Sequence, residues 1–140
     1  MTLIAAIAPA GVVTTHTLFC LRTPLALDDQ RVVCALMNSF VANFLIRLRV
    51  NTHVTVSLIS RLPVPVVRRD DPRFSVLLTL ARALLDAATP AEQCAEFVEL
   101  QARVAQLYGL TEEQFARVLE TFPLVDEGVR RRTLARFTQR

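Results

Sequence analysis

The first apolar residues of this chain follow a pattern typical of β-structure. Residues Thr2 to Ala8 and Val12 to Leu21 are rich in Ile, Val, Thr and Phe, a composition that favours strands. The Ala8-Pro9-Ala10-Gly11 step between them offers turn residues. We therefore expect a small N-terminal β-hairpin or sheet.

A helical period replaces this pattern after residue 27. Asp28 or Asp29 can cap a helix, and apolar residues then recur on one face to about Arg49. The residues on that face are Val33, Leu36, Met37, Phe40, Val41, Phe44, Leu45 and Leu48. The first half of the chain thus predicts a sheet packed on one long helix.

Residues 54–62 fit two patterns, a strand by alternation and a helix by an apolar stripe at helical spacing. We favour a short helix capped by Thr52 or His53. Pro63 and Pro65 each lack a backbone donor and disfavour a helical residue before them. An extended stretch is expected there.

Helix start and stop signals divide the second half. Asp71-Pro72 begins a helix that runs to about Leu85, and a capping box at Thr89 to Glu92 begins one that Gly109 ends. Thr111 to Gln114 begins a third helix, which Pro123 ends, and a last helix begins near Asp126. The fold class expected is therefore α+β, with a three- or four-helix C-terminal annex. We divide the chain into residues 1–69 and the annex of residues 70–140.

The composition favours a folded chain with apolar surface to spare. Hydrophobic residues make up 52% of the 140 residues, and the mean hydropathy is +0.37, which argues against disorder and suggests a partner. Pro9 and Gly11 interrupt the first apolar run, and polar residues interrupt the run from Val32 to Ile46, so no membrane helix is expected. No basic residue precedes the first run, as a signal peptide would require, and a cytoplasmic location is expected.

Positive charge is concentrated in the first half. Residues 1–69 hold seven arginines against two aspartates, a formal charge of +5, whereas residues 70–140 hold nine arginines against eleven acids, a charge of −2. All sixteen basic residues are arginine, which we attribute first to coding bias and second to a preference for forked phosphate contacts. The first half is the candidate surface for a polyanion.

Metal and hydrolase chemistry find no support in the sequence. Cys20, Cys34 and Cys94 are far apart in apolar surroundings, so reduced core thiols are expected. With His16 and His53 they form no metal-ligand spacing, and we predict no metal site. No Gly-x-Ser-x-Gly elbow occurs.

Several segments, taken in order, resemble one known family. They are Gly11 to Phe19, the helix through Asn38 to Phe40, Arg47 to Pro65, Leu107 to Phe115 and Thr121 to Val125. Over nearly the whole chain they look like the C-terminal end of the large N6-adenine DNA methyltransferases of restriction-modification and related phage-defence systems. The resemblance implies a parent enzyme that transfers a methyl group from S-adenosylmethionine to a flipped adenine. In that family this region binds DNA and helps to read the site, so the resemblance implies that residues 1–69 are the end of a DNA target-recognition domain.

The chain departs from that family in its catalytic motifs. It has no Asn-Pro-Pro-Tyr motif, and its only glycines, Gly11, Gly109 and Gly128, form no cofactor-binding turn. We therefore expect no catalytic residue, no bound cofactor and no enzymatic activity of its own. The chain is interpreted as a C-terminal fragment or truncated gene product that works with the parent's catalytic domain. The sequence leaves open which bases are read and whether the parent carries a nuclease.

Two groups of residues are candidate DNA contacts. Thr14, Thr15 and His16 on the second expected strand can donate to phosphates or base edges, although an ordinary exposed strand face would look the same. The second group is Arg47, Arg49, Asn51, Thr52, His53, Thr55 and Arg61. Arg47 and Arg49 also suit the C-terminal end of a helix dipole without any DNA.

A second hypothesis comes from another class of protein. The apolar composition and helical annex would also suit a protein–protein docking or oligomerisation module with no nucleic-acid contact. Such a fragment would self-associate, whereas the first hypothesis requires binding to double-stranded DNA.

Overall fold

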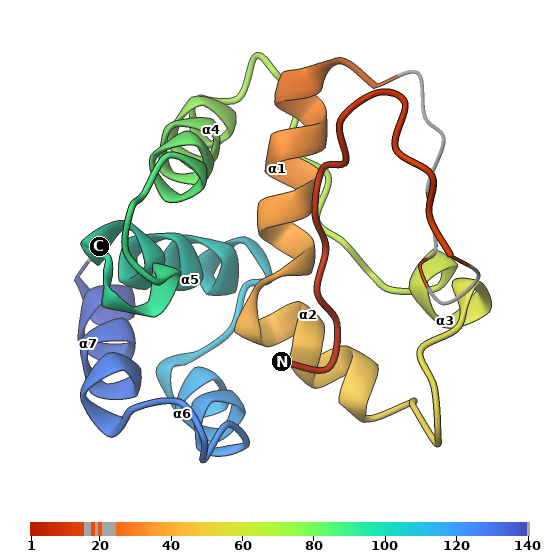
Figure 1. Ribbon diagram of the computed structural model, residues 1–140. Coiled ribbons are helices and arrows are strands. Elements are labelled where there is room, and N and C mark those ends of the chain that lie inside the picture. The colour runs from red at the N-terminus through yellow and green to blue at the C-terminus, as the bar shows by residue number, and fades with distance from the viewer. Residues whose placement is uncertain (16–17, 19, 21–24, 140) are drawn as a thin grey trace.

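The computed structural model describes residues 1–15, 18, 20 and 25–139, and within these ranges the regular structure is entirely helical (Figure 1). The helices are α1 (Leu27–Met37), α2 (Phe40–Arg47), α3 (Val56–Ser60), α4 (Pro72–Leu85), the short 3₁₀ helix η1 (Ala91–Gln93), α5 (Ala95–Leu107), α6 (Glu112–Glu120) and α7 (Glu127–Thr138). No strand occurs in the described part of the chain. The expected α+β class, with its N-terminal hairpin or sheet, is therefore wrong.

The N-terminal segment is bound to helices instead of to a second strand. Asn43 Oδ1 accepts hydrogen bonds from the backbone N–H groups of Thr2 and Leu3, both at 2.8 Å. Asn38 Oδ1 accepts from the N–H of Ala5 at 2.9 Å, and Asn38 Nδ2 donates to the carbonyl of Ala5 at 2.8 Å. Side-chain amides thus satisfy backbone groups that a hairpin would have paired.

The chain still turns where turn residues were expected. Residues 10 and 11 form a turn, and Gly11 has a φ of +83°, a conformation that glycine adopts without steric cost. The turn separates the two halves of an open loop without pairing them.

The predicted long helix is two helices. α1 ends at Met37, and Ser39 caps α2 because its hydroxyl accepts from the N–H of Ala42 at 3.1 Å and donates to the carbonyl of Leu36 at 2.7 Å. Ser39 has an extended backbone, with ψ at 156°, so the helix cannot continue through it. Apolar spacing alone did not reveal this break, because the apolar face continues across it.

The start of α1 also differs from the expected cap. Its N-cap is Ala26, which makes no side-chain capping bond, and Asp28 and Asp29 lie within the first turn. Carboxylates there interact favourably with the helix dipole. In this structure they also bind arginines, as described below.

The short helix α3 confirms the favoured pattern for residues 54–62. Its cap is Thr55, whose hydroxyl accepts from the N–H of Leu58 at 3.3 Å, and not Thr52 or His53. The segment from residue 63 to residue 68 has no regular structure, as its prolines predict.

The annex contains four α-helices, within the predicted number. Asp71 caps α4 with Pro72 as the first helical residue, and Thr111 and Gln114 form a reciprocal capping box at α6. Asp126 caps α7. The box expected at Thr89 does not form, because η1 occupies that position and α5 begins at Ala95.

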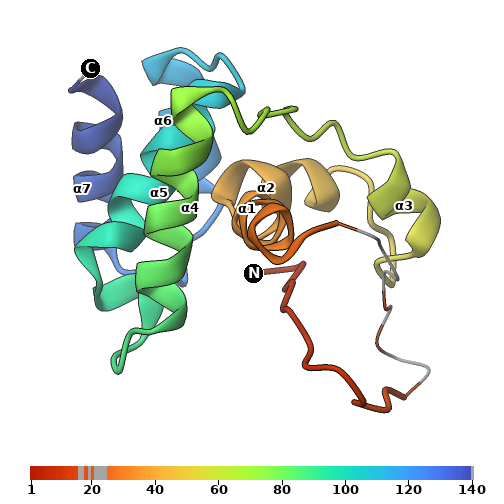
Figure 2. The same ribbon diagram turned by 90° about the horizontal axis from the view of Figure 1, so that it is seen from above.

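The core crosses the boundary between the two predicted parts. Phe40 and Val41 of α2 pack with annex residues such as Phe97, Phe115 and Phe122. A second cluster joins Val32, Ala35 and Leu36 of α1 to Phe74, Leu77, Ala81, Leu100 and Val104 of the annex. The α1–α2 pair therefore forms the centre of the molecule, between the annex on one side and α3 with the N-terminal segment on the other (Figures 1 and 2).

Candidate nucleic-acid interface

Most of the second candidate group lies on the connection between α2 and α4, on the side of the molecule away from the annex (Figure 2). We call residues 49–61, which include α3, the 49–61 segment. Within it the candidate side chains are exposed; they are Arg49, Asn51, Thr52, His53, Thr55 and Arg61. Thr55 also has the structural role of capping α3.

One hydrogen bond joins the two ends of this segment. Arg49 Nη1 donates to the backbone carbonyl of Arg61 at 3.1 Å, across twelve positions of sequence. The backbone at Arg49 is set by the end of α2, where the N–H of Arg49 donates to the carbonyl of Ile46 at 3.0 Å. The Arg49 guanidinium therefore lies beside the backbone of Arg61.

Within the part of the chain that the structure describes, no carboxylate pairs with these cations. Residues 30–69 contain six arginines and neither aspartate nor glutamate. Among the ion pairs of the described residues, none involves Arg49, Arg61 or Arg68. Exposed arginines without acidic neighbours give a positive potential that attracts phosphates.

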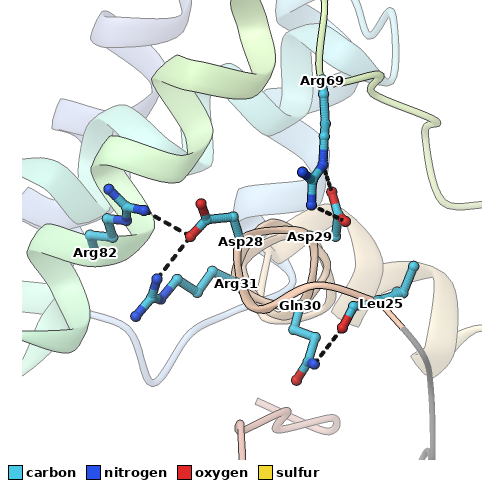
Figure 3. Close-up of polar contacts among 7 residues, drawn as sticks. All are labelled: Leu25, Asp28, Asp29, Gln30, Arg31, Arg69 and Arg82. Atoms are coloured by element: carbon cyan, nitrogen blue, oxygen red, sulfur yellow. Dashed lines mark hydrogen bonds and ion pairs between the residues drawn. The ribbon is translucent and has the colours of Figure 1, made fainter.

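The two aspartates of the first half are engaged at the start of α1 (Figure 3). Asp28 Oδ1 accepts from Arg82 of α4 and from Arg31, each at 2.8 Å. Asp29 accepts two hydrogen bonds from Arg69, at 2.9 Å from Nε and 2.6 Å from Nη2. The guanidinium groups of Arg82 and Arg31 lower the pKa of Asp28, and that of Arg69 lowers the pKa of Asp29.

Arg47 differs from the other candidates because its guanidinium is used within the fold. Its Nε donates to the hydroxyl of Thr2 at 3.0 Å, and its Nη1 donates to the backbone carbonyl of Thr121. The group also lies 4.1 Å from the centre of the Phe122 ring, a cation–π contact. Arg47 thus connects the N-terminal segment, α2 and the end of α6, and it is half-buried.

The first candidate group is on a separate segment. Thr14 Oγ1 lies 3.2 Å from Cys20 Sγ, and the carbonyl of Thr15 accepts from the N–H of Leu18 at 3.1 Å. His16 lies outside the described residues. Since residues 12–15 form no strand, the strand face on which these contacts were predicted is not formed there.

Arg68 joins the candidate group because it is exposed and takes part in no ion pair among the described residues. It is followed by Arg69, whose side chain is bound to Asp29. The sequence shows Arg68-Arg69 only as a charge run beside Asp70-Asp71. Which of the two arginines is neutralised depends on the position of α1, which no local pattern reveals.

The described part of the chain offers neither a cluster of metal ligands nor a membrane-spanning helix. No group of three or more His, Cys, Asp or Glu side chains is placed to hold a metal ion there. None of its helices has the length and apolarity needed to cross a bilayer.

Comparisons with protein-family models, with curated proteins and with solved structures found no match.

Proposed function

We propose that this chain binds duplex DNA through the 49–61 segment. We further propose that it serves as the target-recognition part of an adenine-specific DNA methyltransferase in a restriction-modification or phage-defence system. S-adenosylmethionine and the chemistry belong, on this proposal, to the parent's catalytic domain. A cytoplasmic location is part of the same proposal.

One observation carries the DNA proposal. The guanidinium of Arg49 lies beside the backbone of Arg61, and both residues are exposed and take part in no ion pair among the described residues. Asn51, Thr52 and His53 lie on the segment between them and are exposed. Arginine forks suit phosphate oxygens, and amide and hydroxyl groups suit phosphates and base edges.

The resemblance to the methyltransferase family supports the same region, because the segment Arg47 to Pro65 is among those that carry it. The exposed groups of the 49–61 segment are the proposed DNA contacts, because residues 12–15 form no strand that would present Thr14 and Thr15. Arg47 is given a structural role, since the fold already uses its guanidinium.

The direct experiment is titration of a short fluorescent duplex with the full chain, followed by anisotropy at low salt. We expect binding to be weakened by Arg49→Ala and by Arg61→Ala. Arg131→Ala is the matched control, because Arg131 is also exposed and makes no described side-chain contact, but lies on α7. Absence of binding by the unmodified chain, or an equal effect of all three substitutions, would contradict the proposal.

A docking module is the second candidate, and exposed apolar side chains favour it. Leu48 and Val56, at either end of the α2–α3 connection, are 66% and 60% exposed, and Val66 is 88% exposed. Exposed apolar side chains suit a protein partner. A chain that oligomerises and does not bind DNA would favour this candidate over the first.

A further inference from the structure

The N-terminal segment of residues 2–7, which we call the arm, is hydrogen-bonded along one edge only. On that edge, Asn43 accepts from Thr2 and Leu3, and Asn38 pairs with both the N–H and the carbonyl of Ala5. Cys34 Sγ adds a hydrogen bond to the same Ala5 carbonyl at 3.3 Å. These groups hold the arm extended against α1 and α2.

The opposite edge of the arm carries unpaired backbone groups. In an extended chain, successive residues direct their N–H and C=O groups to opposite edges. Thr2 departs from this alternation because it shares Asn43 with Leu3, and the bonds of Leu3 and Ala5 follow it. Ile4 and Ala6 alternate with Leu3 and Ala5, and no hydrogen bond of their backbone occurs within the described part of the chain. Their side chains are also outside the core, with Ile4 79% exposed.

Nothing in the sequence of the arm protects this edge from pairing. Natural edge strands usually carry a charged residue, a proline or a bulge that prevents association. Between Met1 and Ala8 there is no charged side chain and no proline. Two copies of this edge would therefore meet without side-chain charge repulsion.

We propose that the arm is a self-association site, at which the free edge of one copy pairs antiparallel with the same edge of a second copy. Identical edges are self-complementary across a twofold axis. In the register that uses both free residues, Ile4 of one copy exchanges hydrogen bonds with Ala6 of the other. Ala5 then lies at the axis, where its small side chain allows close approach.

The second copy is the occupant that best fits this edge. The complementary edge must present alternating backbone donors and acceptors, must be uncharged, and must place an apolar side chain beside Ala6. The arm itself meets all three conditions, since Ile4 of the partner copy covers Ala6 in this register. The inference uses no residue of the 49–61 segment, so it stands or fails independently of DNA binding.

The test combines sedimentation velocity over a concentration series with amide hydrogen exchange of the full chain by NMR. We expect a dimer to form as concentration rises, and the amides of Ile4 and Ala6 to become protected with it. The amides of Leu3 and Ala5 are already bonded to asparagines and should be protected in the monomer as well. A chain that stays monomeric, or a dimer in which Ile4 and Ala6 remain unprotected, would overturn the proposal.

A matched pair of substitutions locates the contact. Ile4→Lys places a charge on the free edge, and we expect it to weaken association about tenfold because twofold symmetry counts each unfavourable contact twice. Leu124→Lys is the control, since Leu124 is 100% exposed but lies outside the arm, on the connection between α6 and α7. Both variants should keep the circular dichroism and melting temperature of the parent chain. Equal association of the two variants would overturn the proposal.

Discussion

The side-chain amide of Asn38 makes two hydrogen bonds with the backbone of Ala5. Its Oδ1 accepts from the N–H at 2.9 Å, and its Nδ2 donates to the carbonyl at 2.8 Å. This is the pattern of bonds that a residue of a neighbouring strand would make. The C-terminal end of α1 thus provides the hydrogen bonds that a neighbouring strand would otherwise make with the arm. Asn43 does the same for two further N–H groups, at Thr2 and Leu3.

Replacement of Asn43 by alanine tests this arrangement. Asn43 is fully buried, and its Nδ2 also donates to the carbonyl of Ser39 at 3.1 Å. Because the substitution leaves buried backbone groups without partners, we expect a loss of about 1–3 kcal/mol in the free energy of unfolding, measured with urea. Asn51→Ala is the control; Asn51 is exposed, and its change should stay within about 0.5 kcal/mol. Equal stability of the two variants would contradict the role of Asn43.

These asparagines show why the helices could be predicted from the sequence and why the expected hairpin was wrong. Apolar spacing and caps such as Asp71, Thr111 and Asp126 are local signals, and the helices follow them. The arm has strand-like residues, but its pairing depends on Asn38 and Asn43, more than thirty positions away. No pattern within a short window shows that a side-chain amide will replace a strand.

The candidate site shows the same division between local and distant information. The exposure of Asn51, Thr52 and His53 follows from their polarity between two apolar segments. The structural role of Arg47 does not follow from a local pattern, because its partners Thr2 and Thr121 are 45 and 74 positions away in the sequence. Charge alone could not distinguish an arginine used in the fold from one that is free.

Arg47→Ala should affect stability more than DNA binding. The substitution removes two hydrogen bonds and the cation–π contact with Phe122, so we expect a loss of about 1–2 kcal/mol in the free energy of unfolding. Urea unfolding measures this loss, and anisotropy with duplex DNA should show an affinity close to that of the parent chain. Arg49→Ala should show the reverse. The structural assignment of Arg47 fails if its alanine variant is as stable as the parent chain and binds DNA as weakly as Arg49→Ala.

The ion pairs at the start of α1 predict a loss of stability in acid. Arg82 and Arg31 lower the pKa of Asp28, and Arg69 lowers the pKa of Asp29. Since both carboxyl groups bind protons more weakly in the folded than in the unfolded chain, their stabilisation is complete above the ordinary aspartate pKa. It is lost as the pH falls through the lowered values. Urea midpoints measured from neutral pH downward should fall in that range.

Two asparagine substitutions isolate the contribution of these pairs. Asp29→Asn should reduce stability at neutral pH and make the acid loss shallower, because one linked proton is removed. Asp70→Asn is the control, since Asp70 is exposed and its side chain makes no described contact. Parallel pH profiles for the two variants would show that the pair between Asp29 and Arg69 contributes nothing measurable, as is the case for many exposed ion pairs.

The shared core predicts that residues 1–69 and 70–140 unfold together. Gln101 of α5 is buried, and its Oε1 accepts from the N–H of Phe40 at the start of α2 at 2.7 Å. Gln101→Leu leaves that buried N–H unpaired, so we expect a loss of about 1–3 kcal/mol with a single transition by circular dichroism and calorimetry. Gln93→Leu makes the same change at an exposed position and should have little effect. Two separate transitions, only one of them shifted by Gln101→Leu, would show instead that the two parts are independent.

The salt dependence of DNA binding tests the central claim most directly. If Arg49 and Arg61 each contact a phosphate, the slope of log K against log salt concentration for the parent chain should be steeper by about 1.8 than that of the Arg49→Ala/Arg61→Ala double variant. Arg131→Ala should keep the parent slope. An unchanged slope in the double variant, or binding by the parent chain that does not vary with salt, would contradict the assignment of the 49–61 segment to DNA.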